Sequence, residues 1–340
     1  MRGSNRFAVQ ILAKTLKQLK ASHIPIAVSS MDVSRSVDID VGIPLAGWAQ
    51  DVDLEKYPGG LTYGSRAPLK AALRSGTAND PVLFLQLSPP VAAAEVVQEG
   101  AAEAGWLKGV IPVVMGGSFW GCYDIGTTQP CAEYNVAHNV TASQVFWGVP
   151  AASWAQPLRV VPTVPARVFV VNGTSYESLI QGAASSPAAA SLLGAFKFWF
   201  THGGQAMIGP LPWDWGPSVG TSAVYDLLAA WAAVTAVNTS AMQQQQAHQP
   251  GCVGQLAGAL VWEDHAVTVL DSGLTQLCPV QGGHAEPGAG LNASSGAAHT
   301  PPVRGCVAVR LARGWATPPP GPLIGNVTAC IASTLRSGAT

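Results

Sequence analysis

The sequence has little charge of either sign. Of its 340 residues only 11% are Asp, Glu, Lys or Arg, and the formal net charge at pH 7 is -1. Nucleic acids and anionic membranes are bound through basic surfaces, so this balance argues against both as partners. Hydrophobic residues make up 48% of the chain, which excludes general disorder and predicts a large buried core.

Long apolar runs are also missing. No run reaches the about 18 residues that a transmembrane helix needs, so we expect no membrane span. The segment Met1–Lys20 is basic, with apolar residues at helical spacing, and predicts an amphipathic helix. It lacks the apolar core and the small-residue cleavage site of a signal peptide, so we expect the chain as given to start inside a folded helix.

The cysteines show no C-x-x-C spacing, which argues against a zinc site. Their even number is compatible with three disulfides among Cys122, Cys131, Cys252, Cys278, Cys306 and Cys330. Five of the eight asparagines lie in N-x-[ST] sequons, namely Asn139, Asn172, Asn238, Asn292 and Asn326. Chance would place about one there. Both features predict an exported glycoprotein, extracellular or in the secretory pathway, whose start is missing.

The first two thirds of the chain alternate helical patterns with short apolar runs. Helices are expected near residues 6–20, 68–75, 91–104 and 141–147, and strands at 23–30, 81–87, 109–115 and 158–161. Strands that are apolar throughout and alternate with helices predict an α/β fold. We expect an open, mostly parallel, Rossmann-like sheet with helices on both faces.

The last third is less regular. A Gln-rich link at 243–250 follows the core of residues 6–240. The part at 251–340 predicts strands at 266–270 and 307–311, a Gly/Ala/Pro-rich insertion at 282–302, and a final helix near 326–335. We interpret residues 1–340 as a single domain with long loops.

Two short motifs follow the apolar run at 109–115. Met115-Gly-Gly ends that run, and Ala132-Glu-Tyr-Asn135 comes about 18 residues later, followed by Asn139-Val-Thr-Ala-Ser143. In open α/β sheets ligands bind beyond the carboxyl ends of the strands, so residues at these positions are candidates for a binding site. The pair resembles the M-G-G and A-E-F-N signature of the inosine/uridine-preferring nucleoside hydrolases, with Asn139 replacing an Asp at a helix N-cap. Pro157–Pro162 is similar to a further strand of that family.

The resemblance implies a ribose-binding site. It assigns Glu133 and Asn135 to hydrogen bonds with ribose hydroxyls and Met115 to contact with the sugar face. Taken one at a time, Glu133 is as readily a surface carboxylate and Met115 a core residue; their order behind a strand favours the site.

A second match lies at Ser222–Val234, which resembles the family's H-D-P-x-A-V-A segment. It places Asp226 at a Ca²⁺ ligand and Tyr225 at the position of the leaving-group histidine. A lone Asp at a helix start is otherwise a cap. The resemblance implies a nucleoside hydrolase fold and Ca²⁺-assisted hydrolysis of the N-glycosidic bond of a ribonucleoside, through an oxocarbenium-like transition state.

Several family features are altered here. The D-x-D-x-x-x-D-D motif of the family's first strand, which supplies most calcium ligands and the general base, is absent from the chain. The G-P-L-T-N-L-A segment reads Ser88–Ala94, where the main-chain carbonyl of Val91 could still bind Ca²⁺. A substrate-binding Asn aligns with Thr127, and Cys122 and Cys131 could close a disulfide loop over the pocket mouth.

Three functions remain open. The first is an exported nucleoside N-ribohydrolase without its first strand; the second is a glycosylated extracellular pseudoenzyme that binds a nucleoside or sugar without hydrolysis. The third is a structural glycoprotein, which the A-E-x-N motif argues against. A different acid–base chemistry could use His202 with Asp214, and His202 could equally act as the leaving-group acid. A homo-oligomer is possible, and the base preference stays open.

Overall fold

The structure is a computed structural model that describes residues 3–28, 49–103, 105–123, 128–167, 225–237, 260–278 and 306–315, with positions 181 and 190. Contacts divide the chain into two compact units. The first comprises Met1–Pro68, Val170–Ala223 and Pro319–Thr340, and the second comprises Leu69–Phe169 and Val224–Pro318. The single domain over residues 1–340 stays a prediction.

The first unit contains α1 (Gly3–Gln18), β1 (Ile26–Val28), the short helix η2 (Leu54–Lys56) and β2 (Leu61–Tyr63), with β1 parallel to β2. A small apolar cluster of Val9, Ala13, Ile26 and Tyr57 holds these elements together. Asp51 pairs with Lys14 at 2.7 Å, and Asp53 caps η2 and pairs with Lys56 at 3.0 Å. Both carboxylates therefore serve local structure.

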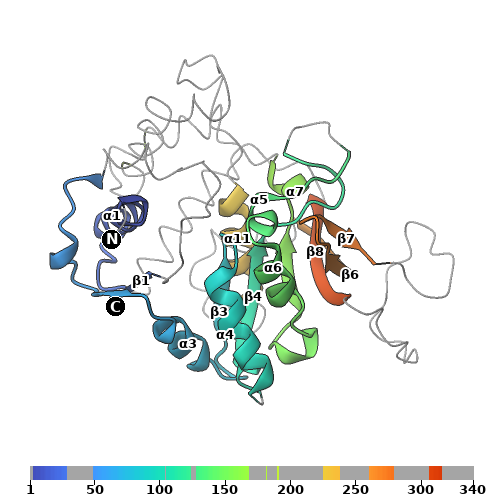
Figure 1. Cartoon of the computed structure of the whole chain (residues 1–340), viewed down its shortest axis with the longest axis horizontal. Helices are drawn as coiled ribbons and strands as arrows, with labels where there is room; N and C mark the ends of the chain where they lie inside the picture. The colour runs from blue at the N-terminus through green and yellow to red at the C-terminus, as the bar shows by residue number, and fades with distance from the viewer. Residues whose placement is uncertain are drawn as a thin grey trace. The chain divides into compact units, whose positions relative to one another are not determined.

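The second unit is built on a six-stranded sheet of order β3-β4-β5-β8-β6-β7 (Figure 1). The strands β3 (Val82–Gln86), β4 (Val110–Met115), β5 (Leu158–Val161) and β8 (Val307–Trp315) are parallel. The strands β6 (Leu260–Val269) and β7 (Thr275–Leu277) add an antiparallel hairpin beside β8. The sheet is thus mixed and mostly parallel.

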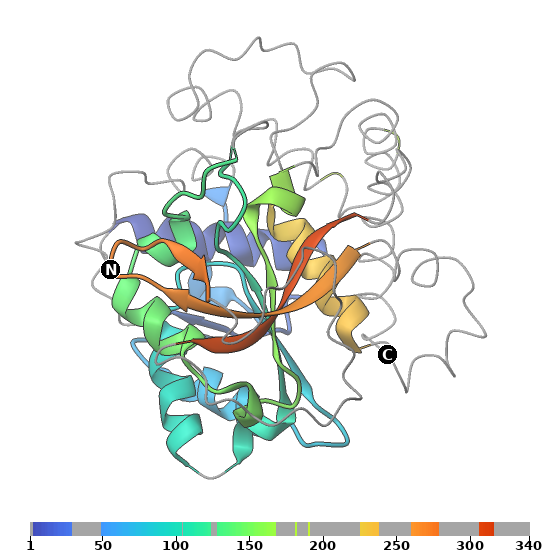
Figure 2. The same cartoon turned by 90° about the vertical axis from the view of Figure 1, so that its right-hand side faces the viewer.

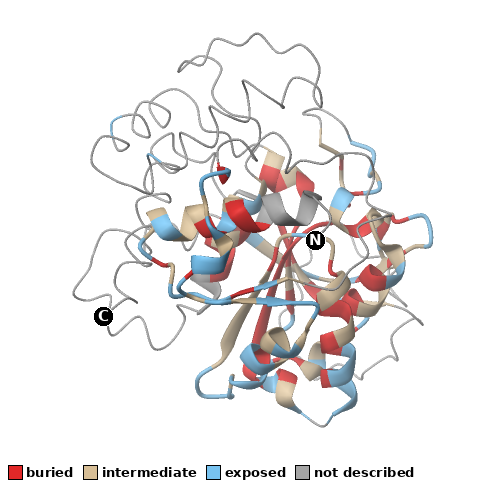
Figure 3. Ribbon diagram, turned by 60° about the vertical axis from the view of Figure 1, so that its left-hand side comes forward, coloured by how far each residue is buried: buried red, intermediate tan, exposed pale blue. Residues whose placement is uncertain are grey.

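Helices cover both faces of this sheet. The helices α4 (Val91–Ala102) and α6 (Val140–Trp147) pack on one face, and α11 (Tyr225–Val237) packs on the other, with the short α7 (Thr163–Arg167) beside it (Figure 2). All six residues of β4 are buried, because this strand is covered on both sides (Figure 3). The predicted α/β fold with helices on both faces is confirmed.

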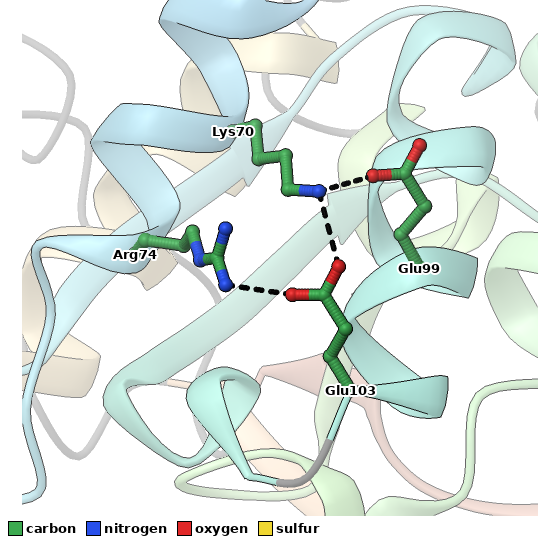
Figure 4. A network of polar contacts seen from close by, with 4 residues as sticks. All are labelled: Lys70, Arg74, Glu99 and Glu103. Carbon is green, nitrogen blue, oxygen red and sulfur yellow. Dashed lines mark hydrogen bonds and ion pairs between the residues drawn. The ribbon is translucent and has the colours of Figure 1, made fainter.

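A charged network fixes α3 (Ala67–Arg74) to α4 on the surface (Figure 4). Lys70 pairs with Glu99 and Glu103, and Arg74 pairs with Glu103 at 2.6 Å. The Arg74 guanidinium also lies 5.9 Å from the centre of the Trp106 ring. These groups are partly exposed, so the network contributes orientation more than stability.

The core elements agree with the sequence patterns to within a few residues. The strand expected at 266–270 is longer, and the β6–β7 hairpin was not predicted. The Gln-rich link, the insertion at 282–302 and the helix near 326–335 lie outside the described residues. No helix in the described part of the chain is long and apolar enough to cross a membrane.

Candidate functional site

The site lies at the carboxyl end of β4, where the chain turns through Gly116 and Gly117. Gly117 has φ 84°, and a Cβ there would meet the Phe119 ring at 2.9 Å, so glycine alone fits this turn. The turn is tied to the end of β5, because the Gly116 N–H donates to the Val161 carbonyl at 3.1 Å. This geometry gives the Met115-Gly-Gly motif its structural reason.

Glu133 is the N-cap of α5 (Tyr134–Ala137) and is only 2% exposed. Its Oε1 accepts hydrogen bonds from the Asn135 N–H at 3.0 Å and the Tyr123 hydroxyl at 3.2 Å. Its Oε2 accepts from the N–H groups of Gly117 and Val136, both at 3.2 Å. One carboxylate thus joins the β4 turn, the start of α5 and Tyr123.

This bonding uses the acceptor capacity of the Glu133 carboxylate, since two oxygens offer about four lone-pair positions. Burial raises the pKa of Glu133 above its ordinary value, and the three backbone donors and Tyr123 act in the opposite direction. The ribose contact that the resemblance implies for Glu133 stays a prediction. In the structure the carboxylate stabilises the protein around the site.

Asn135 holds the ends of two neighbouring strands. Its Nδ2 donates to the Met115 carbonyl at 3.2 Å and to the Leu87 carbonyl at 3.4 Å, and lies 3.5 Å from the Met115 sulfur. These bonds fix the orientation of the amide. No described residue donates to its Oδ1, so this oxygen is the acceptor that the local structure leaves for a ligand.

A small cavity lies beside this amide, lined by strand-end and helix residues that include Gln86, Ser88, Met115, Asn135 and Trp147. Its volume is about 10 Å³, far below the about 300–1,000 Å³ of typical ligand sites and close to the space that one water molecule needs. As it stands, the cavity has room for a single small group at most. The sequence motifs and the cavity coincide at Met115 and Asn135.

Two tyrosines connect Glu133 to the start of α11. The Tyr123 hydroxyl accepts from the Tyr134 N–H at 2.6 Å, and its ring packs edge-to-face with Tyr225 at 5.7 Å. The Tyr225 hydroxyl in turn donates to the Tyr123 carbonyl at 3.4 Å. Burial, followed by the charge of Glu133, raises the pKa of Tyr123, so this hydroxyl stays protonated. Sequence reasoning missed Tyr123; its place beside Cys122 was the one available signal.

Asp226 lies in the first turn of α11. Its side chain is exposed to solvent, although atoms packed around it hinder hydration of the charged form. This desolvation, followed by the negative charge of Glu133, raises the pKa of Asp226 to about 6. Asp226 is therefore the titratable group of the site whose protonation changes near neutral pH.

A disulfide joins Cys122 to Cys131, the pairing that the sequence suggested. The Ser118 hydroxyl bonds the Gly121 carbonyl and accepts from the Cys131 N–H at 2.9 Å, and Arg167 donates to the Cys122 carbonyl at 2.8 Å. A second disulfide joins Cys278 to Cys306. The two bridges are compatible with an extracellular protein.

Asn139 caps α6, accepting from the Ala142 N–H at 2.9 Å. The Asn that replaces the family's Asp therefore does the work of an N-cap. Thr127 and His202, the other two residues assigned to the site from sequence, lie outside the described residues.

The described residues show no cluster of metal-binding side chains. No group of three or more His, Cys, Asp or Glu side chains among them is placed to hold a metal ion, whereas Ca²⁺ takes six to eight oxygens. Val91 is the first residue of α4, where helical geometry directs its carbonyl to the backbone four residues later. The ligand roles of Val91 and Asp226 stay predictions.

The arrangement defines an α/β protein with a small cavity at the carboxyl end of its parallel strands. No family model and no curated protein matches the chain. Among solved structures it is similar to the type III effector protein XopQ complexed with adenosine diphosphate ribose, with a TM-score of 0.53 and 14% identity over 98% of this chain and 81% of that one.

The effector protein XOO4466 is similar to the same extent, with a TM-score of 0.51 and 14% identity over 98% of this chain and 80% of that one. A plant nucleoside hydrolase, PpNRh1, aligns with a TM-score of 0.47 and 15% identity over 81% of this chain and 67% of that one. The chain shares the overall fold of the two effector proteins. Membership of the inosine/uridine-preferring family stays a prediction.

Proposed function

We propose that this chain binds a ribosyl compound, either a nucleoside or ADP-ribose, at the carboxyl end of β3 and β4. The observation that carries the proposal is the Asn135 amide, held by two strand-end carbonyls with its Oδ1 left without a described donor. An acceptor fixed in this way suits a sugar hydroxyl. The Met115 thioether beside it offers an apolar surface to the sugar ring.

Two further observations support a ribosyl ligand. The similar structure of XopQ was determined with adenosine diphosphate ribose. The motif around Met115 and Asn135 resembles the sugar-binding half of a nucleoside hydrolase site.

Isothermal titration of the full chain with adenosine, inosine, uridine and ADP-ribose tests the proposal. We expect at least one to bind, and Asn135→Ala to weaken that binding by roughly tenfold or more through loss of a fixed acceptor. The matched control is Gln144→Ala, which removes an amide that bonds Asp271 and the Val269 carbonyl away from the pocket. Binding of none of the four at millimolar concentration, or equal weakening by both variants, would overturn the proposal.

A second candidate is hydrolysis of the N-glycosidic bond, and the pKa of Asp226 favours it. A carboxyl group with a pKa of about 6 can exchange a proton near neutral pH. Release of free base from inosine or uridine, lost in Asp226→Asn, would support it. We nevertheless expect binding without turnover. Both Glu133 oxygens already accept hydrogen bonds within the fold, so Asp226 would have to act without a second carboxylate from the described part of the site.

Calcium dependence is tested separately. We expect no calcium binding tighter than about millimolar by calorimetry, because several carboxylates are needed for a tighter site. A dissociation constant in the micromolar range would contradict this expectation and favour the hydrolase. We further propose an extracellular setting, which the two disulfides support.

A further inference from the structure

Two arginines lie side by side on the central sheet of the second unit. Arg159 of β5 is in register with Arg310 of β8, and parallel strands are about 4.8 Å apart, so both side chains leave the same face. The neighbouring residues Leu158 and Val160 pack into the core with α4 and α6. The arginines therefore face the opposite side, away from that core.

The described residues around Arg159 do not balance its charge. Its Nη2 donates to the neutral Gln156 side chain at 2.8 Å, its guanidinium lies 5.7 Å from the centre of the Trp262 ring, and its buried Nε has no hydrogen-bond partner. Burial, followed by the like charge of Arg310, lowers the pKa of Arg159. Two adjacent like charges on paired strands repel each other.

One carboxylate of the described residues accompanies this pair. Asp264 of β6 is in register with Arg310 and approaches its Nε at 3.1 Å. The cluster of Arg159, Arg310 and Asp264 therefore keeps one positive charge in excess. Asp264 and Arg310 are 57% and 42% exposed at their side chains, so a small ligand can reach them from solvent.

We propose that Arg159 and Arg310 form an anion site for a phosphate group, separate from the pocket at Asn135. Each guanidinium presents a planar fork of N–H donors that matches two oxygens of an oxyanion. A carboxylate has two oxygens and satisfies one fork, whereas a phosphate has enough oxygens to bridge both. The group is either free phosphate or a phosphate ester, since both present the same oxygens.

Calorimetry on the full chain at constant ionic strength, with inorganic phosphate, glycerol 3-phosphate and acetate as probes, tests this site. We expect saturable binding of phosphate or its ester and much weaker binding of acetate. Arg159→Met keeps an unbranched apolar side chain but loses the charged guanidinium, and should weaken phosphate binding by roughly tenfold or more. The tighter of the two phosphate probes identifies the source.

The chain offers a matched control and a variant that should raise phosphate affinity instead of lowering it. Arg313→Met removes another arginine of β8, the strand that carries Arg310. Arg313 pairs with Glu263 at 3.0 Å and lies over Trp120, so its loss should leave phosphate affinity unchanged. Asp264→Asn removes the competing carboxylate and should tighten phosphate binding. The proposal is overturned if phosphate and its ester do not saturate the wild-type chain, if acetate binds as tightly, or if Arg159→Met and Arg313→Met behave alike.

Discussion

Replacement of Glu133 by Gln tests whether this buried carboxylate stabilises the fold. In the structure its two oxygens accept four hydrogen bonds, three from backbone N–H groups and one from the Tyr123 hydroxyl. Gln has the same shape but replaces one oxygen by an NH₂ group. Either orientation of the amide places that NH₂ against donors.

The expected cost follows from those contacts. Placing the NH₂ at Oε2 deprives the Gly117 and Val136 N–H groups of their acceptor, and each such loss costs about 1–3 kcal/mol. In the alternative orientation the NH₂ takes the place of Oε1. The Asn135 N–H and the Tyr123 O–H, whose oxygen already accepts from Tyr134, then lose their acceptor. The remaining bonds also lose their charge-assisted strength. We expect Glu133→Gln to lower the free energy of unfolding by about 3–5 kcal/mol.

Urea unfolding followed by tryptophan fluorescence measures this change, provided that both chains give the same denaturant slope. Glu103→Gln is the matched control, because Glu103 is 45% exposed in its ion pairs and should cost less than about 1 kcal/mol. A loss below about 1 kcal/mol for Glu133→Gln would refute the structural role and return Glu133 to the set of candidate ligand contacts.

Three further predictions concern the same end of the sheet. Asn139→Ala should destabilise the chain by about 1 kcal/mol through loss of the α6 cap, and Asn139→Asp should restore it in thermal unfolding. The pKa of Asp226, about 6, lies above its ordinary 3.8, so its stabilising contribution is complete below pH 3.8 and is lost as pH rises through 6. The stability of Asp226→Asn should accordingly vary less between pH 4 and 6.5 than that of the wild type; equal slopes would contradict the pKa. Replacing Cys122 and Cys131 by Ser should cost about 2–3 kcal/mol in urea unfolding, and an unchanged midpoint would show that the loop is held by its hydrogen bonds alone.

The pattern of the sequence was sufficient for the fold class. Each strand of a covered parallel sheet is an uninterrupted apolar run, and Val110–Met115 shows this most clearly, with all six residues buried. The N-cap at Asn139 was predictable for a similar reason, because a cap depends on residues a few positions away. The hairpin β6–β7 was not predicted as a unit, since β7 has only three residues and β6 is held by its pairing with the distant strand β8.

The candidate site was predictable only in its location. The spacing of Met115, Glu133 and Asn135 indicated a pocket after β4, and the cavity lies there. The roles within it depend on contacts between distant segments. Tyr123, which sequence reasoning did not select, donates to Glu133 and packs on Tyr225, 102 residues later.

The sequence by itself determined the order of strands and helices, the turn at Gly116-Gly117 and the caps, because local backbone preferences and hydrophobic period act over a few residues. Only the tertiary structure decided how the polar groups are used. It directs four donors to Glu133, leaves Asn135 Oδ1 without a donor among the described residues, and places Arg159 beside Arg310. The physical reason is that hydrogen bonding and desolvation depend on which atoms meet in space, and strand register brings together residues that the chain separates by more than a hundred positions.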